Sequence, residues 1–184
     1  MFNLSDTDLV RHAQGGDMEA AGELYDRHNE PIFRYVWSRV YDRQTAEDLT
    51  GEIFERVVAS LPSYRSTGVP FRAWLYRIAH NLVVDHHRKR GGRELISLEH
   101  AEGLHEEGNN PDSVVERRLA TQQVRHALEE LDPSQREVVK LRFLDGLSLN
   151  EVALTLDKSV PAVKSLQYRG LIGLRALLNG RLKG

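Results

Sequence analysis

The sequence predicts an all-α protein of two small helical domains joined by a flexible acidic linker. Apolar residues recur at helical spacing through most of the 184 residues, and no segment alternates as a half-buried strand would. Residues 91–113, GGRELISLEHAEGLHEEGNNPDS, are rich in Gly, Asn, Glu and Ser and have no sustained helical period. We therefore expect an N-terminal domain over residues 1–92, a linker over 93–112 and a C-terminal domain over 113–184.

Composition excludes several classes of protein. The chain has no cysteine, so it can form neither a disulfide nor a thiolate metal site. No apolar run reaches the length of a signal peptide or a membrane helix. No Walker loop, metal-binding motif or nucleophile–base set is visible. We expect a cytoplasmic, non-enzymatic protein with no cofactor, no metal and no membrane insertion.

The formal net charge of −2 conceals basic and acidic segments that alternate along the chain. Residues 61–93 carry 7 Lys and Arg against 1 acidic residue, and residues 134–184 carry 9 against 4. Residues 1–60 carry 6 basic against 12 acidic residues, and residues 94–133 carry 3 against 10. The two basic segments suit a nucleic-acid partner, although charge runs also occur on surfaces that are merely solvated.

Periodicity and capping residues place the helices of the N-terminal half. We expect helices over residues 6–12, 18–40, 46–61 and 71–89. Ser5 followed by Asp8, and Thr45 followed by Asp48, resemble N-caps with an acid at the third helical position.

The third of these helices, in AEDLTGEIFERVVASLP, carries three carboxylates on one stripe: Asp48, Glu52 and Glu55. Leu49, Ile53 and Val57 form an adjacent apolar stripe that can pack inward. No metal partner or base-orienting group accompanies the carboxylates, so a catalytic role is not supported. The stripe is either a solvated face or a docking surface for a basic partner.

The fourth helix, in YRSTGVPFRAWLYRIAHNLVVDHHRKRGG, combines aromatic and cationic residues. We expect Phe71, Leu75, Ile78 and Leu82 to form its buried face. Beside that face a second stripe contains Trp74, Arg77, Asn81 and Arg88, while Tyr76, His80 and His87 lie farther round.

Rings that stack on unpaired bases and cations that hold phosphates suit single-stranded DNA, and the loop at residues 63–70 could receive a flipped base. Core packing is the alternative for Trp74. A metal site at His80, His86 and His87 is disfavoured, because adjacent helical residues point about 100° apart.

The C-terminal half predicts helices over residues 113–130, 133–144, 149–156 and 160–178, the last two forming a helix-turn-helix. Asp132 with Pro133, Ser148 with Glu151, and Ser159 are its capping signals. On the last helix, one side gathers Val160, Val163, Leu171, Leu174 and Leu178. The opposite side carries Pro161, Ala162, Ser165, Tyr168 and Arg169, flanked by Lys164 and Arg175. Residues near the start of this helix would reach base edges, and its cations would neutralise phosphates.

Taken in order, these features resemble bacterial extracytoplasmic-function (ECF, group IV) sigma factors, the two-domain promoter-specificity subunits of RNA polymerase. The resemblance covers roughly residues 8–178 and is carried by AEDLTGEIFERV, FRAWLYRIAHNLVVDHHRKR and LDPSQREVVKLRFLDGLSLNEVALTLDKSVPAVKS. It implies core RNA polymerase (beta-prime clamp helices and beta flap), promoter DNA and an anti-sigma factor as partners.

Three sets of site residues follow from the residue patterns and the resemblance together. The polymerase-docking set is Asp48, Leu49, Glu52, Phe54 and Glu55. The set for the minus-ten promoter element is Ser63, Tyr64, Arg65, Trp74, Arg77, Asn81, Asp85, Arg88 and Lys89. The set for the minus-thirty-five element is Lys158, Ser159, Pro161, Ala162, Lys164, Ser165, Tyr168 and Arg169.

The chain departs from the family pattern at three places. Gly51 stands where Gln is frequent, inside the expected docking helix. Asp157 and Lys158 occupy the turn where Gly is common, and Asp tolerates the left-handed conformation better than most residues. Leu166 and Gln167 replace the usual Arg and Leu, so base contacts near them cannot be copied from the family.

A second hypothesis is a two-domain helix-turn-helix regulator that binds duplex DNA without acting as a sigma subunit. Such a protein would not need the stripe from Trp74 to Arg90.

Overall fold

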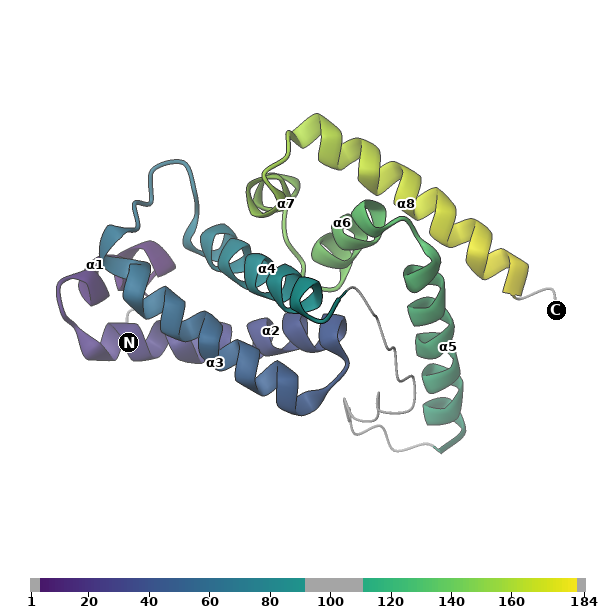
Figure 1. Cartoon of the computed structure of the whole chain (residues 1–184), viewed down its shortest axis with the longest axis horizontal. Helices are drawn as coiled ribbons and strands as arrows, with labels where there is room; N and C mark the ends of the chain where they lie inside the picture. The colour runs from purple at the N-terminus through teal and green to yellow at the C-terminus, as the bar shows by residue number, and fades with distance from the viewer. Residues whose placement is uncertain (1–3, 92–110, 182–184) are drawn as a thin grey trace. The chain divides into compact units, whose positions relative to one another are not determined.

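The computed structural model describes residues 4–91 and 111–181 of the chain. Within these ranges the protein is entirely helical, and no strand is present. The helices fall into two compact units (Figure 1). The expected all-α fold with two small helical domains is therefore confirmed. Most of the expected linker lies outside the described residues. No helix within the described ranges has both the length and the apolar content needed to cross a membrane.

The N-terminal unit contains α1 (Asp6–Gln14), α2 (Met18–Val40), α3 (Arg43–Ser60), a 3-10 turn (Leu61–Ser63) and α4 (Phe71–Lys89). The bounds of α2 and α4 match the sequence prediction. Ser5 caps α1 as expected, since its Oγ accepts from Asp8 N at 3.2 Å.

The predicted cap at Thr45 is wrong. The side chain of Asp42 accepts from Thr45 N at 2.8 Å, so α3 begins at Arg43, three residues earlier than expected. Thr45 lies inside the first turn of α3. At that position its backbone N–H needs an acceptor, and its hydroxyl does not cap the helix.

The core of the N-terminal unit surrounds α2, which packs against α1, α3 and α4 (Figure 1). Tyr35 on α2 and Tyr76 on α4 are both buried, with their ring centroids 5.3 Å apart in an edge-to-face arrangement. Tyr76 was expected outside the buried face. Of the residues expected to form that face, Ile78 is only half-buried, whereas the others are buried.

Polar contacts fasten α1 to the rest of this unit. Asp6 accepts from His28 Nε2 at 2.8 Å and from Arg27 Nη1 at 3.2 Å, which joins the start of α1 to α2. At the other end, Gln14 Nε2 donates to the carbonyls of Leu61 and Tyr64, both at 2.9 Å. The short α1 is therefore anchored at both ends.

The later helices are α5 (Pro111–Glu130), α6 (Pro133–Phe143), α7 (Leu149–Leu156) and α8 (Val160–Arg181). The bounds of α7 match the prediction, while α5 starts two residues earlier and α8 ends three residues later than expected. Asp132 caps α6, with Pro133 in its first turn, as predicted. Leu171 was expected on the inner side of α8, but it is 38% exposed.

α8 packs closely on α6 because it carries a glycine at the contact. A Cβ built on Gly170 would lie 2.8 Å from Val139 Cγ2, which is closer than two carbon atoms can approach. Leu128, Leu131 and Val139 form a buried apolar cluster, against which Leu174 and Leu177 of α8 pack.

An ionic cluster joins α5 to α6. Glu129 accepts from Arg136 Nη1 at 2.8 Å and from Lys140 Nζ at 3.0 Å. The Lys140 side chain is only 5% exposed and that of Glu129 only 13%. Because so little water reaches the cluster, each charge depends on its partner, and removal of one partner is far more destabilising than loss of a surface ion pair.

We predict that Glu129→Gln lowers the stability of the C-terminal unit by about 3 kcal/mol, because the buried Lys140 ammonium loses the negative charge that lies 3.0 Å from it. Both tryptophans, Trp37 and Trp74, lie in the N-terminal unit, so their fluorescence reports on that unit alone. In urea, part of the circular dichroism signal of the variant should be lost at a lower urea concentration than in the wild type. The midpoint of the fluorescence transition should be the same in both proteins.

The double variant Glu129→Gln/Lys140→Met removes the buried ammonium together with the carboxylate charge and should recover part of the loss. A circular dichroism curve for the single variant that coincides with that of the wild type would show that the cluster is not stabilising.

Candidate nucleic-acid interface

The outer face of α4 presents the polar stripe expected from the sequence. Arg77, Asn81, Arg88 and Lys89 are exposed along it. Asp85 is half-buried, and its Oδ1 lies 3.0 Å from Arg88 Nη2. This exposed ion pair limits where the guanidinium can reach but contributes little stability. The stripe thus offers three cationic side chains and one amide to a ligand.

Trp74 lies at the beginning of this stripe and is half-buried. Its ring centroid lies 4.6 Å from that of Tyr64 and 5.7 Å from that of Phe71. Tyr64 and Phe71 are buried, so one part of the indole packs on the core and the rest is accessible. Core packing and surface exposure, which the sequence left as alternatives, both apply to this side chain.

Tyr64 is a structural support of the loop between α3 and α4. It is 6% exposed, and its hydroxyl donates to Val69 O at 2.6 Å, which closes the loop over five residues. Burial raises the pKa of this phenol, so the hydroxyl stays protonated as a donor at neutral pH. The ring lies in the aromatic cluster and is not presented to solvent.

The other two loop residues expected in the minus-ten set are exposed. Ser63 Oγ donates to Ser60 O at 2.8 Å. Arg65 Nη1 donates to the carbonyls of Pro62 and Tyr64, both at 3.1 Å, so its guanidinium is held against the loop backbone.

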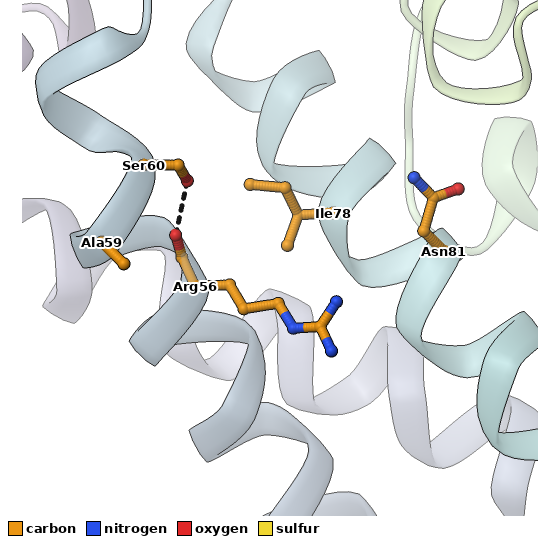
Figure 2. Close-up of a pocket in the computed structure, with 5 residues that line it drawn as sticks. All are labelled: Arg56, Ala59, Ser60, Ile78 and Asn81. Carbon is orange, nitrogen blue, oxygen red and sulfur yellow. Dashed lines mark hydrogen bonds between the residues drawn. The ribbon is translucent and has the colours of Figure 1, made fainter.

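A pocket of about 360 Å³ opens between α3 and α4, lined by Arg56, Ala59, Ser60, Ile78 and Asn81. Figure 2 shows the α3 residues on one side and the α4 residues on the other, with the Arg56 guanidinium reaching toward α4. Its floor is partly apolar, and its polar groups are a guanidinium, a hydroxyl and an amide. This combination can hold a flat heterocycle and hydrogen-bond to its edge.

Sequence analysis identified Asn81 for this region but missed Arg56 and Ser60. These two residues lie on α3, the helix before α4, and only the packing of α3 on α4 brings them to the same pocket. No periodicity within α3 distinguishes them from other exposed positions.

The helix-turn-helix is formed by α7, a short turn and α8. Ser148 and Glu151 form the expected reciprocal capping box, with Ser148 N donating to Glu151 Oε2 at 2.7 Å and Glu151 N donating to Ser148 Oγ at 3.1 Å. Asp157 has a φ of 53°, so it adopts the left-handed conformation expected for the turn. Ser159 Oγ accepts from Ala162 N at 3.3 Å at the start of α8.

The side of α8 that was expected to read DNA faces outward throughout. All residues of the minus-thirty-five set are exposed: Lys158, Ser159, Pro161, Ala162, Lys164, Ser165, Tyr168 and Arg169. Tyr168 is 67% exposed, so its ring is accessible on this side of α8. Val163 on the inner side is fully buried.

Gln167, one of the two residues that depart from the family pattern, faces inward on α8. Its Oε1 accepts from Arg142 Nε at 2.9 Å, and Arg142 Nη1 also donates to Leu147 O. Arg142 therefore links α8 to the chain that leads into α7. The departure at Gln167 changes how the last helix is held and leaves the exposed face unaltered.

The polymerase-docking set divides between the surface and the core of α3. Asp48 and Glu55 are exposed, and Glu52 is half-buried with its Oε1 2.8 Å from Arg56 Nη2. Leu49 and Phe54 are 7% and 9% exposed and face inward. They fix the orientation of the helix, and the carboxylates supply its outer charge.

The histidines near the end of α4 do not gather into a metal centre. Among the residues that the structure describes, no group of three or more His, Cys, Asp and Glu side chains could hold a metal ion. Burial lowers the pKa of His86, and the charges of Arg90, His87 and Lys89 lower it further. His86 is therefore neutral at neutral pH.

Two known protein families match parts of the chain. The Sigma-70 region 2 family matches residues 24–93, and the Sigma-70 region 4 family matches residues 121–172. The first match contains α3, the loop, the pocket and α4. The second contains α7, the turn and α8 as far as Ile172.

Curated relatives cover the two modules together. The chain is 38% identical to the ECF RNA polymerase sigma factor BldN of Streptomyces coelicolor over 93% of its own length and 65% of BldN. It is 32% identical to SigE of Mycolicibacterium smegmatis over 88% of its length and 62% of SigE. The chain thus spans less than two thirds of these two relatives. It is also 32% identical to the RNA polymerase sigma factor CnrH of Cupriavidus metallidurans, over 97% of both chains.

Among solved structures, CnrH in complex with the cytosolic domain of CnrY resembles the chain with a TM-score of 0.72 and 27% identity. That match covers 95% of this chain and 97% of CnrH.

We predict that Tyr64→Phe loosens the loop without disturbing the core. The variant keeps the ring and loses only the hydrogen bond to Val69, which contributes about 1 kcal/mol. Amide hydrogen exchange of residues 65–69 should accelerate about fivefold, whereas Tyr168→Phe, at an exposed tyrosine on α8, should leave it unchanged. Equal exchange rates in the wild type and Tyr64→Phe would exclude this role for the hydroxyl.

Proposed function

The chain belongs to the ECF family of RNA polymerase sigma factors, and from this premise we propose that it binds core RNA polymerase and directs it to a specific set of promoters. In this proposal the N-terminal domain, residues 1–92, docks on the polymerase and opens the minus-ten element. The C-terminal domain, residues 113–184, reads the minus-thirty-five element as duplex. The protein acts in the cytoplasm and carries out no enzymatic step of its own.

The observation that carries the proposal is the pocket beside Asn81 in a chain that also has an exposed helix-turn-helix face. A regulator that binds only duplex DNA needs the second feature and has no use for the first. The pocket volume of about 360 Å³ is sufficient for a nucleobase. Its position beside Asn81, in the middle of the basic α4 stripe, supports a role for unpaired DNA.

The chemistry of the pocket supports capture of a flipped base. Ile78 and Ala59 offer apolar contact to a base face, while the Asn81 amide and the Arg56 guanidinium offer hydrogen bonds to its edge. Arg77, Arg88 and Lys89 on the same helix lie exposed, where they can follow the phosphates of the displaced strand. Trp74 adds a partly accessible ring on which a neighbouring base can stack.

For the C-terminal unit, the exposed face of α8 supports entry into the major groove. Pro161, Ala162 and Ser165 lie in its first two turns, where small side chains allow close approach to base edges. Lys164 and Arg169 flank them and supply phosphate contacts.

The charge of α3 supports docking on a basic polymerase surface. Asp48, Glu52 and Glu55 lie along the helix, which matches the element that the family uses for the beta-prime clamp helices. The beta flap is the corresponding partner that we assign to the C-terminal domain. Because CnrH was solved with the cytosolic domain of CnrY, we further propose that a protein partner, an anti-sigma factor, controls this chain.

Transcription with purified components tests the proposal. Core polymerase alone and core polymerase with the chain are compared on a library of promoter fragments, and the transcript starts are mapped. We expect initiation at a restricted set of sites that share a minus-ten and a minus-thirty-five sequence. Tight binding of the chain alone to duplex DNA, with no initiation by any core enzyme, would support the second hypothesis instead.

We predict that Asn81→Ala reduces promoter opening about tenfold, because loss of a hydrogen bond to a captured base amounts to about 1.4 kcal/mol. Permanganate reactivity of unpaired thymines measures the opening. Affinity for core polymerase, measured by fluorescence anisotropy, should not change. Asn179→Ala, at an exposed position on α8, is the matched control and should behave as wild type. Equal loss of opening and of core binding would contradict the assigned role of Asn81.

A further inference from the structure

The outward side of α3 has the spacing of a helix-packing surface. Gln44, Asp48, Gly51, Glu55 and Val58 follow one another at intervals of four, three, four and three residues, and all five are exposed. This alternation keeps the five positions in one line along the outer side of the helix, where a partner helix can lie lengthwise on them. Val58 is 68% exposed although it is apolar. We call these five residues the α3 seam.

Gly51 lies at the centre of the α3 seam, and nothing in the described part of the chain requires a glycine there. A Cβ built on Gly51 meets no atom within 4 Å. Its φ is not among the positive values, which occur at Gly16, Gly68, Gly91 and Gly146 among the glycines. Gly is the least favourable helix residue after Pro, so its presence weakens α3 without any gain inside the fold.

The contrast with Gly170 shows what a packing glycine looks like in this protein. There, an added Cβ would lie 2.8 Å from Val139, and the missing side chain allows α8 to approach α6. Gly51 has the same helical setting, but no atom of the described residues lies within 4 Å of an added Cβ. If a helix of another molecule packed against α3, the missing side chain of Gly51 would allow the same close approach.

The charges along the α3 seam indicate the character of that neighbour. Glu47 and Glu52 lie off the seam, and each has an arginine partner within α3, at 2.9 and 2.8 Å. On the seam, Asp48 has only the neutral Gln44 amide at 3.0 Å, and Glu55 has no hydrogen bond or ion pair with any described residue. The seam therefore carries negative charge that the fold does not compensate, and this favours a basic partner.

We propose that Gly51 is the point of closest approach of a basic helix of core RNA polymerase, which lies lengthwise on the α3 seam. One bulky residue of that helix sits over Gly51, and cations on either side face Asp48 and Glu55. The absent Cβ lets the two helices come closer than the usual 8–10 Å between axes. This inference rests on the proposed function and adds to it a specificity-determining position.

Gly51→Ala in the full chain tests the inference, with Gly22→Ala as the matched control. Gly22 lies exposed in α2, and a Cβ there also meets no atom within 4 Å. Both substitutions improve helix propensity, so both should raise the Tm of the N-terminal unit, followed by tryptophan fluorescence, by about 4 °C. Gly51→Ala should weaken the affinity for core polymerase at least tenfold, and Gly22→Ala should leave it unchanged.

A Gly51→Ala variant that is more stable and binds core polymerase as tightly as wild type overturns the inference and leaves the proposed function standing. Equal loss of affinity in Gly51→Ala and Gly22→Ala also overturns it, because the loss would then follow helix stability rather than contact. If the wild-type chain itself fails to bind any core polymerase, the proposed function fails, and the inference fails with it.

Discussion

The contact between Tyr35 and Tyr76 determines which faces of the N-terminal unit are available for function. The two rings are buried at 5.3 Å from each other and join α2 to α4. Once α4 is rotated to bury Tyr76, Arg77 and Asn81 must face outward, because neighbouring helical residues point about 100° apart. The same packing places α3 beside α4 and so creates the pocket. The burial of Tyr76 against Tyr35 is therefore consistent with the outward orientation of the surfaces assigned to DNA on α4.

Local signals in the sequence were sufficient for most of the helices, and tertiary contacts explain the exceptions. The bounds of α2, α4 and α7 and the capping box of Ser148 with Glu151 followed from periodicity and short-range hydrogen bonds. The start of α3 did not, because Asp42 and Thr45 are both acceptable caps and the folded chain selects Asp42. Leu171 was placed wrongly because the helical period of one helix does not show which of its apolar residues a neighbouring helix covers.

The candidate site shows the same division. All residues of the minus-thirty-five set are exposed, as predicted. The periodicity of α8 alone was sufficient to predict its outer side, without knowledge of the other helices. In contrast, Tyr64 was assigned to DNA and lies in the core, because its hydrogen bond to Val69 and its ring contacts are made across a loop. Arg56 and Ser60 were missed for a related reason, as their pocket exists only between two helices.

The bridge made by Gln14 alters where a functional module of this chain begins. The sigma region 2 match starts at residue 24, after α1 has ended. Yet the Gln14 amide holds the carbonyls of Leu61 and Tyr64, which form the root of the loop beside the pocket. A chimaera that transfers only the matched residues into another sigma factor would lack Gln14, and the start of this loop would lose both hydrogen bonds. Residues 5–14 and residues 61–64 form one structural unit, so a chimaera has to include both segments.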